Sequence, residues 1–535
     1  MLADVKKLTA FSLAAMVLTA PLAAQDTPPP PPVLDGYFAK ALADWQVPGL
    51  AIAVVRNDSL LFARGYGVRE LGKPGRVDEH TVFDAASLTK SFTATAIAML
   101  VDEQRMRWDA PVRTYLPELV LPDSYLTRHT TIRDLLTHRT GLQAGNFMWR
   151  FTGYDRTEAL RRMRWLKQEL PFRTSMVYSN IGYTAAGEAS ARAAGTSWES
   201  LIRTRIIEPL GLGDTYLWNE RGARTGGNVA SAHAMIHHVQ MAVDPVEGSA
   251  QREARTATAP AGAIQSSVWD LARWMRFHLA NGLMNGTRLV SEASMYEMHA
   301  PHLVMPAPAR FREVRQLEFF PGYGLGWQVW DYRGHPLLWH SGSGNGQIAY
   351  MAILPRSHLG VVVLVNSWRA PFLHIALASR VIDHYLGFPP RDYSAEDLKA
   401  DSAADARMRE AMARDSMAHY GLTSSPHPEL VRPAAAYAGV YEDTLHGRIT
   451  ITERQGKLTL QMGEGATADL EPWLSDTLLV RWHYPIYRDQ FTTRARFDAD
   501  GTATPQTFLM ILNRDTVRAV RIGRSPFRRS STSSR

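Results

Sequence analysis

The stretch FDAASLTKSFTATAIAMLVDE, residues 83–103, has the pattern of a buried helix that opens on Asp84 and small residues. Ser87 and Lys90 lie three residues apart where this helix is expected to begin. Side chains at that spacing share one helix face, so the hydroxyl and the amine can touch. A serine hydroxyl needs a nearby base to act as a nucleophile, and a buried lysine can be that base. Taken alone, the pattern is more typical of a helix-start serine beside a solvated lysine.

A second polar triplet, Tyr178-Ser179-Asn180, opens another expected helix in VYSNIGYTAAGE. A tyrosine can pass the serine proton to a leaving group if a neighbouring lysine lowers its pKa. The asparagine can hydrogen-bond both a lysine and a substrate amide. A helix cap and a packed tyrosine explain the triplet better when it is taken alone.

The third pattern is His340-Ser341-Gly342-Ser343 in WHSGSGNGQ, at the end of an expected strand. A glycine at this place lets a substrate approach the strand edge, and the next backbone N–H can complete an oxyanion hole. His340 alone also fits a structural histidine at a strand end.

In this order the three patterns resemble Ser-x-x-Lys, Tyr-x-Asn and Lys/His-x-Gly, the motifs of serine β-lactamases and penicillin-binding proteins. The chain looks most like the group that holds class C β-lactamases, D-amino-acid peptidases and related esterases. The resemblance covers roughly residues 33–390 and extends to the text between the motifs. That text includes VPGLAIAVVRND, TIRDLLTHRTGL, IIEPLGLGDT, PAGAIQSSVWDLARW and YGLGWQV.

The resemblance implies a catalytic role for three residues. Ser87 would attack the acyl carbon of the substrate and form an acyl-enzyme. Lys90 and Tyr178 would share the base and acid work, and the division between them differs among accounts of the family. No cofactor is expected.

Four further residues are implied in substrate binding. Asn180 would position the lysine and the substrate, and the N–H of Ser343, after Gly342, would form the oxyanion hole with that of the nucleophile. His340 would contact a substrate carboxylate or tune the tyrosine. Penicillin-recognising relatives usually carry Lys-Thr-Gly here, and a histidine is only partly charged at neutral pH. This departure favours a peptidase, amidase or esterase over a β-lactamase or a slowly deacylating penicillin-binding protein.

The sequence predicts an α/β (α+β) fold with a mixed antiparallel sheet covered by helices and a helical subdomain. Strand-like segments at 49–68 and 323–367 frame the helices, and a closing helix follows at 370–387. Short alternating strands then predict a small all-β unit, either a barrel or a sandwich. This unit resembles the lipocalin-like domain of some such hydrolases, which implies a small all-β barrel. The predicted parts are a signal peptide 1–24, a Pro-rich spacer 25–32, a serine hydrolase domain 33–392, a linker helix 393–432, a barrel 433–523 and a basic tail 524–535.

Composition narrows the function classes. The chain of 535 residues has no cysteine, which excludes disulfides and thiolate chemistry, and a net charge of +7 at pH 7. That charge is spread widely without a nucleic-acid motif, so no nucleic-acid partner is expected. Lys6 and Lys7, an apolar run and small residues near Ala24 predict a cleaved export signal and a periplasmic or secreted protein. An uncleaved anchor is the alternative interpretation.

A metalloenzyme and a non-catalytic binding protein are the alternatives to a serine hydrolase. The 18 histidines show no metal-binding spacing, so no metal is expected. A non-catalytic cell-wall-binding protein, or a sensor that is acylated once, would keep the same motifs. The expected partner is a small-molecule or peptide substrate, such as one derived from the cell wall. The sequence specifies neither the leaving group nor the oligomeric state.

Overall fold

The computed structural model describes residues 28, 30–220, 227–236, 239–243, 255–306, 321–344, 346–420, 432–474, 476–490, 493–498, 504–512 and 515–523. The predicted signal peptide and basic tail lie outside these residues. Within the described part of the chain, the helices fall short of the length and apolarity that a membrane crossing requires.

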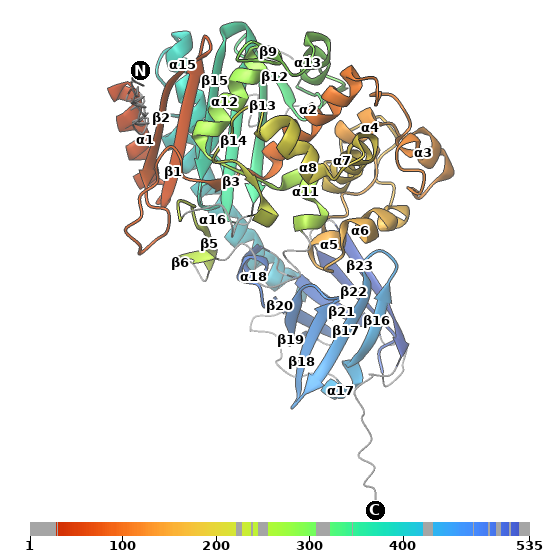
Figure 1. Cartoon of the computed structure of the whole chain (residues 1–535). Helices are drawn as coiled ribbons and strands as arrows, with labels where there is room; N and C mark the ends of the chain where they lie inside the picture. Colours follow the sequence, from red (N-terminus) through yellow and green to blue (C-terminus); the bar gives the residue numbers. More distant parts are fainter. Residues whose placement is uncertain are drawn as a thin grey trace, which may run out of the picture.

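An eight-stranded antiparallel sheet forms the centre of the larger domain, with the order β10-β11-β12-β13-β14-β15-β1-β2 (Figure 1). The first two strands form a hairpin whose turn residues Asn57 and Asp58 have φ of 49° and 61°, the left-handed geometry of a tight two-residue turn. The strands are β1 (Gly49–Arg56), β2 (Ser59–Gly67), β10 (Leu303–Val304), β11 (Gly322–Tyr323), β12 (Gln328–Tyr332), β13 (His335–Gly344), β14 (Gln347–Leu354) and β15 (Leu359–Val365).

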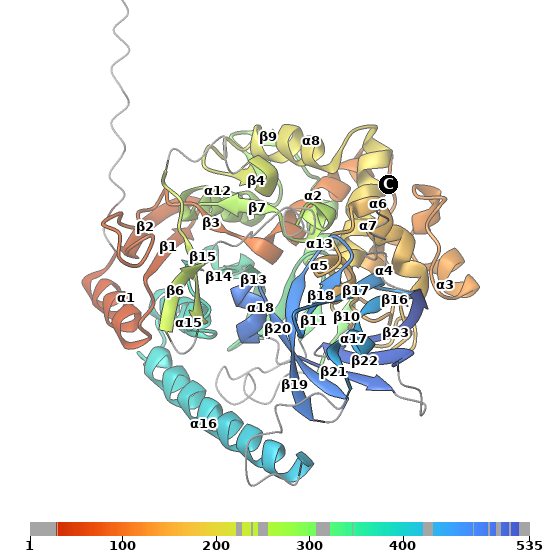
Figure 2. The ribbon, with the colours of Figure 1, turned by 90° about the horizontal axis from the view of Figure 1, so that it is seen from below.

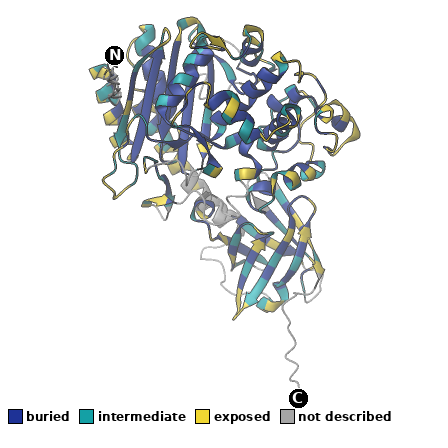
Figure 3. Cartoon of the chain, viewed as in Figure 1, coloured by how far each residue is buried: buried dark blue, intermediate teal, exposed yellow. Residues whose placement is uncertain are grey.

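Helices cover both faces of this sheet. The side chains of strand β1 alternate between the two apolar clusters that these helices form with the sheet. Leu50 and Ile52 pack in one apolar cluster with helices α1 (Pro32–Asp44) and α15 (Leu373–Leu386). Ala51 and Ala53 point to the opposite face, where α12 (Val268–Leu279) and α2 (Thr89–Asp102) pack. Successive residues of a strand face opposite sides, so β1 is buried on both faces, as Figure 3 shows.

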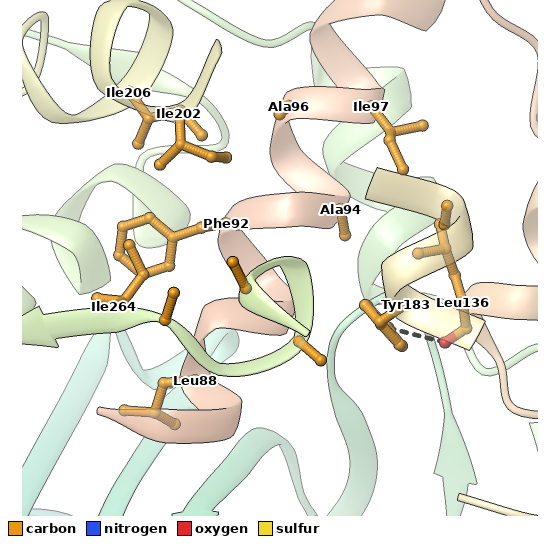
Figure 4. Packing of buried hydrophobic residues seen from close by; sticks show 14 of the residues in the cluster. Leu88, Phe92, Ala94, Ala96, Ile97, Leu136, Tyr183, Ile202, Ile206 and Ile264 are labelled. Atoms are coloured by element: carbon orange, nitrogen blue, oxygen red, sulfur yellow. Dashed lines mark hydrogen bonds between the residues drawn. The ribbon is translucent and has the colours of Figure 1, made fainter. Parts of the chain in front are cut away.

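Helix α2 runs through the middle of a helical subdomain beside the sheet. Two of its apolar side chains point to different neighbours, Phe92 toward Ile202 and Ile264 and Ile97 toward Leu136 (Figure 4). The other helices of this region are α3 (Ser124–His129), α4 (Ile132–Leu136), α5 (Asn146–Arg150), α6 (Arg156–Arg162), α7 (Asn180–Ala194), α8 (Trp198–Ile202), α11 (Ala259–Gly262) and α13 (Glu292–His299).

Seven short strands of the described chain lie outside the main sheet of the larger domain. They form a three-stranded sheet of the order β3-β7-β4 and two separate hairpins. Their bounds are β3 (Phe83–Asp84), β4 (Tyr216–Leu217), β7 (Ile264–Ser266), β5 (Ala232–Ile236), β6 (Val239–Val243), β8 (Leu283–Met284) and β9 (Thr287–Arg288). The predicted mixed fold, with an antiparallel sheet and a helical subdomain, is confirmed.

A closed eight-stranded barrel follows the long helix α16 (Tyr393–Tyr420), and it confirms the predicted all-β unit. Aromatic side chains such as Tyr441, Phe497 and Phe508 fill its interior. Its elements are α17 (Ala434–Tyr437), β16 (Gly439–Asp443), β17 (Gly447–Arg454), β18 (Lys457–Met462), β19 (Thr467–Leu474), β20 (Thr477–Trp482), α18 (Pro485–Gln490), β21 (Thr493–Asp498), β22 (Thr507–Leu512) and β23 (Asp515–Gly523).

The barrel docks on the segment that holds α5 and α6, as the view from below shows (Figure 2). Phe151 enters the core of the barrel, with its ring centroid 4.7 Å from that of Trp482 and 4.4 Å from that of Tyr487. The backbone carbonyl of Phe151 also accepts a 2.7 Å hydrogen bond from the N–H of Ala466. The barrel therefore supports the short helix α5, which forms one wall of the site described next.

Candidate active site

Ser87 lies on a tight 3-10 turn, residues Ala86–Leu88, immediately before helix α2. The helix begins at Thr89, later than the sequence predicts, because Phe83 and Asp84 pair with strand β7 instead. Ala86 has a φ of 46°, in the left-handed region that costs a non-glycine residue about 1–3 kcal/mol. Its N–H donates a 3.0 Å hydrogen bond to Asp84, which holds the strained turn. Strain of this kind is typical of functional positions.

The structure brings Ser87, Lys90, Tyr178 and Asn180 together from two helix starts. Ser87 Oγ lies 2.9 Å from Lys90 Nζ and 2.8 Å from the Tyr178 hydroxyl oxygen. Lys90 Nζ also lies 2.9 Å from Asn180 Oδ1 and 2.9 Å from the carbonyl oxygen of Ala261. These are the contacts that a serine nucleophile, its base and a positioning amide require.

Lys90 is suited to act as a base. Its side chain is fully buried, and this burial lowers the pKa of Lys90 well below its ordinary value. A neutral amine has two N–H donors and one lone pair. The carbonyl oxygens of Asn180 and Ala261 accept two N–H bonds, which leaves the lone pair for the hydroxyl proton of Ser87.

Tyr178 is suited to donate a proton rather than to accept one. Burial raises the pKa of Tyr178, and its hydrogen bond with Ser87 offsets this only in part. Tyr178 could act as a base only if Lys90 lowered the pKa of its phenol, and this pKa is raised instead. The neutral phenol beside Ser87 Oγ is placed to protonate a leaving group. The geometry thus favours Lys90 as base and Tyr178 as acid.

Strand β13 passes directly beside the nucleophile turn, and Gly342 makes this approach possible. A Cβ atom at Gly342 would lie 2.2 Å from the carbonyl oxygen of Ala85 and 3.1 Å from the backbone N of Ser87. No side chain fits there. Ser343, the next residue, lines the same pocket as Ser87. The proposed oxyanion hole of their two N–H groups stays a prediction.

His340 belongs to a buried chain of hydrogen bonds behind the site. Its Nε2 lies 3.0 Å from the Tyr323 hydroxyl and its Nδ1 lies 2.7 Å from the Ser341 carbonyl oxygen. At the other end, His138 Nε2 lies 3.3 Å from the same hydroxyl. The backbone N–H of Ser179 donates a 3.0 Å hydrogen bond to His138 Nδ1.

One assignment of protons satisfies this whole chain. His138 Nδ1 must accept, so its Nε2–H donates to Tyr323, whose O–H donates to His340 Nε2. The Nδ1–H of His340 then donates to the backbone carbonyl of Ser341. Burial lowers the pKa of His340 to about 3, and also lowers that of His138 well below its usual range, so both rings are neutral at pH 7. This network occupies both ring nitrogens of His340, and its expected contact with a substrate carboxylate stays a prediction.

Tyr323→Phe tests this chain. Removing the hydroxyl leaves two buried histidine nitrogens without their partner, so we expect a loss of about 1–3 kcal/mol in unfolding free energy. We also expect kcat/KM to fall about ten-fold, because the strand beside the nucleophile loses its fixed hydrogen bonds. The matched control is Tyr332→Phe, which removes a buried 2.8 Å hydrogen bond to Asp383. A fall in kcat/KM of similar size in both variants would contradict a positioning role for Tyr323.

The sequence analysis did not identify most of the residues that line this pocket, among them four with large aromatic or charged side chains. Trp149 and Arg150 of α5, Arg255 before α11 and Tyr487 of the barrel line the pocket with Ser87. Trp149 stood out only as one tryptophan among several, and Arg255 matches no motif. Tyr487 lies 400 residues beyond the nucleophile, so only the folded barrel brings it to the site.

No group of three or more His, Cys, Asp or Glu side chains that could hold a metal ion occurs in the part of the chain that the structure describes. The cluster around Ser87 consists of a hydroxyl, an amine, a phenol and an amide. These four groups are suited to nucleophilic catalysis by side chains.

Comparison with known proteins gives the family of the larger domain. The Beta-lactamase family model matches residues 34–386, and a domain of unknown function, DUF3471, matches residues 425–512. The unguisins hydrolase ungD of Aspergillus violaceofuscus is 30% identical over 456 residues, which are 79% of this chain and 78% of that protein. The D-alanyl-D-alanine-carboxypeptidase/endopeptidase AmpH of Escherichia coli is 24% identical over 377 residues, 66% of this chain and 86% of its own length.

A solved structure shares the fold. The octameric penicillin-binding protein homologue from Pyrococcus abyssi superposes with a TM-score of 0.58 at 20% identity, covering 91% of this chain and 99% of that one. The family match spans most of the larger domain, including all three motifs. The chain therefore belongs to the beta-lactamase family of serine hydrolases.

Proposed function

We propose that this chain is an exported hydrolase that cleaves amide bonds next to D-amino acids, and related esters, through an acyl-enzyme on Ser87. The observation that carries the proposal is the contact of Ser87 Oγ with both Lys90 Nζ and the Tyr178 hydroxyl. Export is supported by the leader-like pattern of residues 1–24. The D-amino-acid preference is supported by the likeness to AmpH, a D-alanyl-D-alanine-carboxypeptidase/endopeptidase.

The contacts support the following acylation step. The Ser87 hydroxyl gives its proton to Lys90 Nζ while Oγ forms a bond to the substrate carbonyl carbon. The carbonyl oxygen, now negatively charged, accepts hydrogen bonds from the N–H groups of Ser87 and Ser343. The bond to the leaving group then breaks, and the leaving group takes the Tyr178 proton, which Lys90 replaces. This cycle leaves every proton accounted for.

Water then releases the acyl group. A water molecule gives a proton to the neutral amine of Lys90 while its oxygen bonds to the acyl carbon. The bond between the acyl carbon and Ser87 Oγ then breaks, and Lys90 returns the proton to Oγ, which restores the free hydroxyl and the neutral amine. Repeated turnover distinguishes this hydrolase from a sensor that stops after one acylation. Neutral His340, in place of the lysine that penicillin-recognising relatives usually carry, supports a peptidase over a penicillin target.

The test compares the purified chain on an N-acetylated peptide ending in D-Ala-D-Ala and on its L-Ala-L-Ala counterpart, with free alanine as the measured product. We expect repeated turnover of the D peptide and at least about ten-fold lower kcat/KM for the L peptide. Equal rates on the two peptides would contradict the proposed stereochemistry. A single stoichiometric acylation by penicillin without any peptide turnover would favour a penicillin-binding sensor.

A further inference from the structure

Arg255 is a partly buried cation that lines the same pocket as the nucleophile and has spare hydrogen-bonding capacity. Its side chain is 15% exposed, and its Nη2 forms a 2.6 Å ion pair with Asp84. Its Nη1 is buried and has no hydrogen-bond partner among the described residues. A buried donor without an acceptor is unfavourable in the folded protein, and a bound acceptor would relieve that cost. Arg255 lines the pocket that also holds Ser87.

The guanidinium is held in place from two sides. The ring of Trp218 lies against it, with the guanidinium carbon 3.8 Å from the ring centroid. Asp84 holds the Nη2 side and is itself fixed by 2.9 Å and 3.0 Å hydrogen bonds from Gln265 and the backbone N–H of Ala86. The cation is therefore preorganised, which reduces the entropy cost of binding an anion.

The pocket carries a net positive charge. Its charged lining residues in the described chain are Asp84, Arg150 and Arg255. Asp84 is already paired with Arg255, whereas the described residues provide no carboxylate within ion-pair distance of Arg150. Tyr487, from the barrel, closes this side of the pocket and donates a 3.3 Å hydrogen bond to the backbone carbonyl of Arg150. A negatively charged group would balance this surplus.

The pocket that contains the two arginines is also lined by Ser87 and Asn180. In the proposed reaction the leaving group departs toward the hydroxyl of Tyr178, its proton donor. This pocket is then left for the group that stays on Ser87.

We propose that Arg255, assisted by Arg150, forms a subsite for a carboxylate on the acyl part of the substrate. This inference rests on the proposed serine-hydrolase function and narrows its substrate class. Preferred substrates carry a free carboxylate a few bonds from the scissile carbonyl. Acyl groups that carry a free amine are disfavoured, because the arginines repel a cation. The planar guanidinium suits a carboxylate, which can accept two parallel N–H bonds.

The experiment uses the full chain and two esters with the same leaving group, mono(4-nitrophenyl) adipate and 4-nitrophenyl hexanoate. Their acyl chains match except that a carboxylate replaces the terminal methyl of the second. After subtraction of the enzyme-free rate, we expect the wild-type chain to favour the adipate ester. Arg255→Gln should lower the adipate-to-hexanoate ratio of kcat/KM about ten-fold or more, mainly through KM for adipate.

Further variants separate charge from folding. Arg255→Lys keeps a cation beside Asp84 but loses the planar fork, so its ratio should lie between those of wild type and Arg255→Gln. Arg150→Gln should also lower the adipate-to-hexanoate ratio of kcat/KM, and it leaves the Arg255–Asp84 ion pair intact. This variant therefore still tests the subsite if Arg255→Gln does not fold. Arg276→Gln removes a surface arginine paired with Asp58 and should leave the ratio unchanged.

The outcomes separate this inference from the function it rests on. An unchanged ratio in Arg255→Lys and Arg150→Gln, with both esters still hydrolysed, would overturn the carboxylate subsite and leave the hydrolase intact. Ester hydrolysis that persists at full rate in Ser87→Ala would instead overturn the proposed function.

Discussion

Replacing Ser87 by alanine should lower kcat at least about 10⁴-fold on any substrate the chain hydrolyses, because the acyl-enzyme can no longer form. The fold should persist. The change removes the hydrogen bonds of one hydroxyl, which lies beside Lys90 and Tyr178, at a cost of about 1 kcal/mol. The measurements are steady-state turnover and thermal unfolding of the same preparation.

Ser91→Ala is the matched control for this change. Ser91 lies in the first turn of α2, four residues after Ser87, and is buried. Its hydroxyl donates to the backbone carbonyl of Leu88 and accepts from the indole of Trp274 in the described structure. We expect a comparable stability loss and near wild-type kcat. Retention of more than about one tenth of the activity in Ser87→Ala would show that another residue is the nucleophile.

Replacing Lys90 by methionine should lower kcat about 10²–10⁴-fold, the usual contribution of a positioned base. Methionine fills a similar volume in this fully buried site and brings no charge, so the folded state should be retained. Lys40→Met, which removes an exposed lysine paired with Asp44, is the control and should leave kcat unchanged.

The pH dependence of the wild type follows from the same lysine. Lys90 must be neutral to accept the Ser87 proton, and burial places its pKa well below the ordinary lysine value. Activity should therefore fall as the pH is lowered through that pKa and the amine gains a proton. The pH–rate profile of kcat/KM measures this acidic limb. Lys90→Met should lack it, and an identical limb in that variant would assign the titration to another group.

The sequence predicted the features of this molecule that depend on local pattern. The strands within residues 49–68 and the all-β character of the C-terminal unit follow from alternation and turn residues. The start of α2 was predicted too early, because strand pairing of Phe83 and Asp84 and the left-handed Ala86 override the helical pattern. Propensity alone cannot report such tertiary competition.

The residues of the candidate site also fall into two groups, those that a local sequence motif predicts and those that only the folded structure identifies. The three motifs identified Ser87, Lys90 and Asn180, and the fold brings their side chains into contact. Tyr323 and Arg255 escaped notice, because their relevance depends on hydrogen bonds and burial between segments far apart in sequence. A motif records which residue types recur, whereas a charge subsite or a buried relay becomes visible only when the chain is folded.

The most direct test of the central claim is intact-mass spectrometry after treatment with a fluorophosphonate, followed by peptide mapping. Lys90 and Tyr178 activate one hydroxyl in this account, so the wild-type chain should gain a single phosphonyl adduct on Ser87, and Ser87→Ala should gain none. An adduct of the same stoichiometry on Ser87→Ala, or an adduct mapped to Ser179 or Ser343 in the wild type, would contradict the assignment of Ser87 as nucleophile.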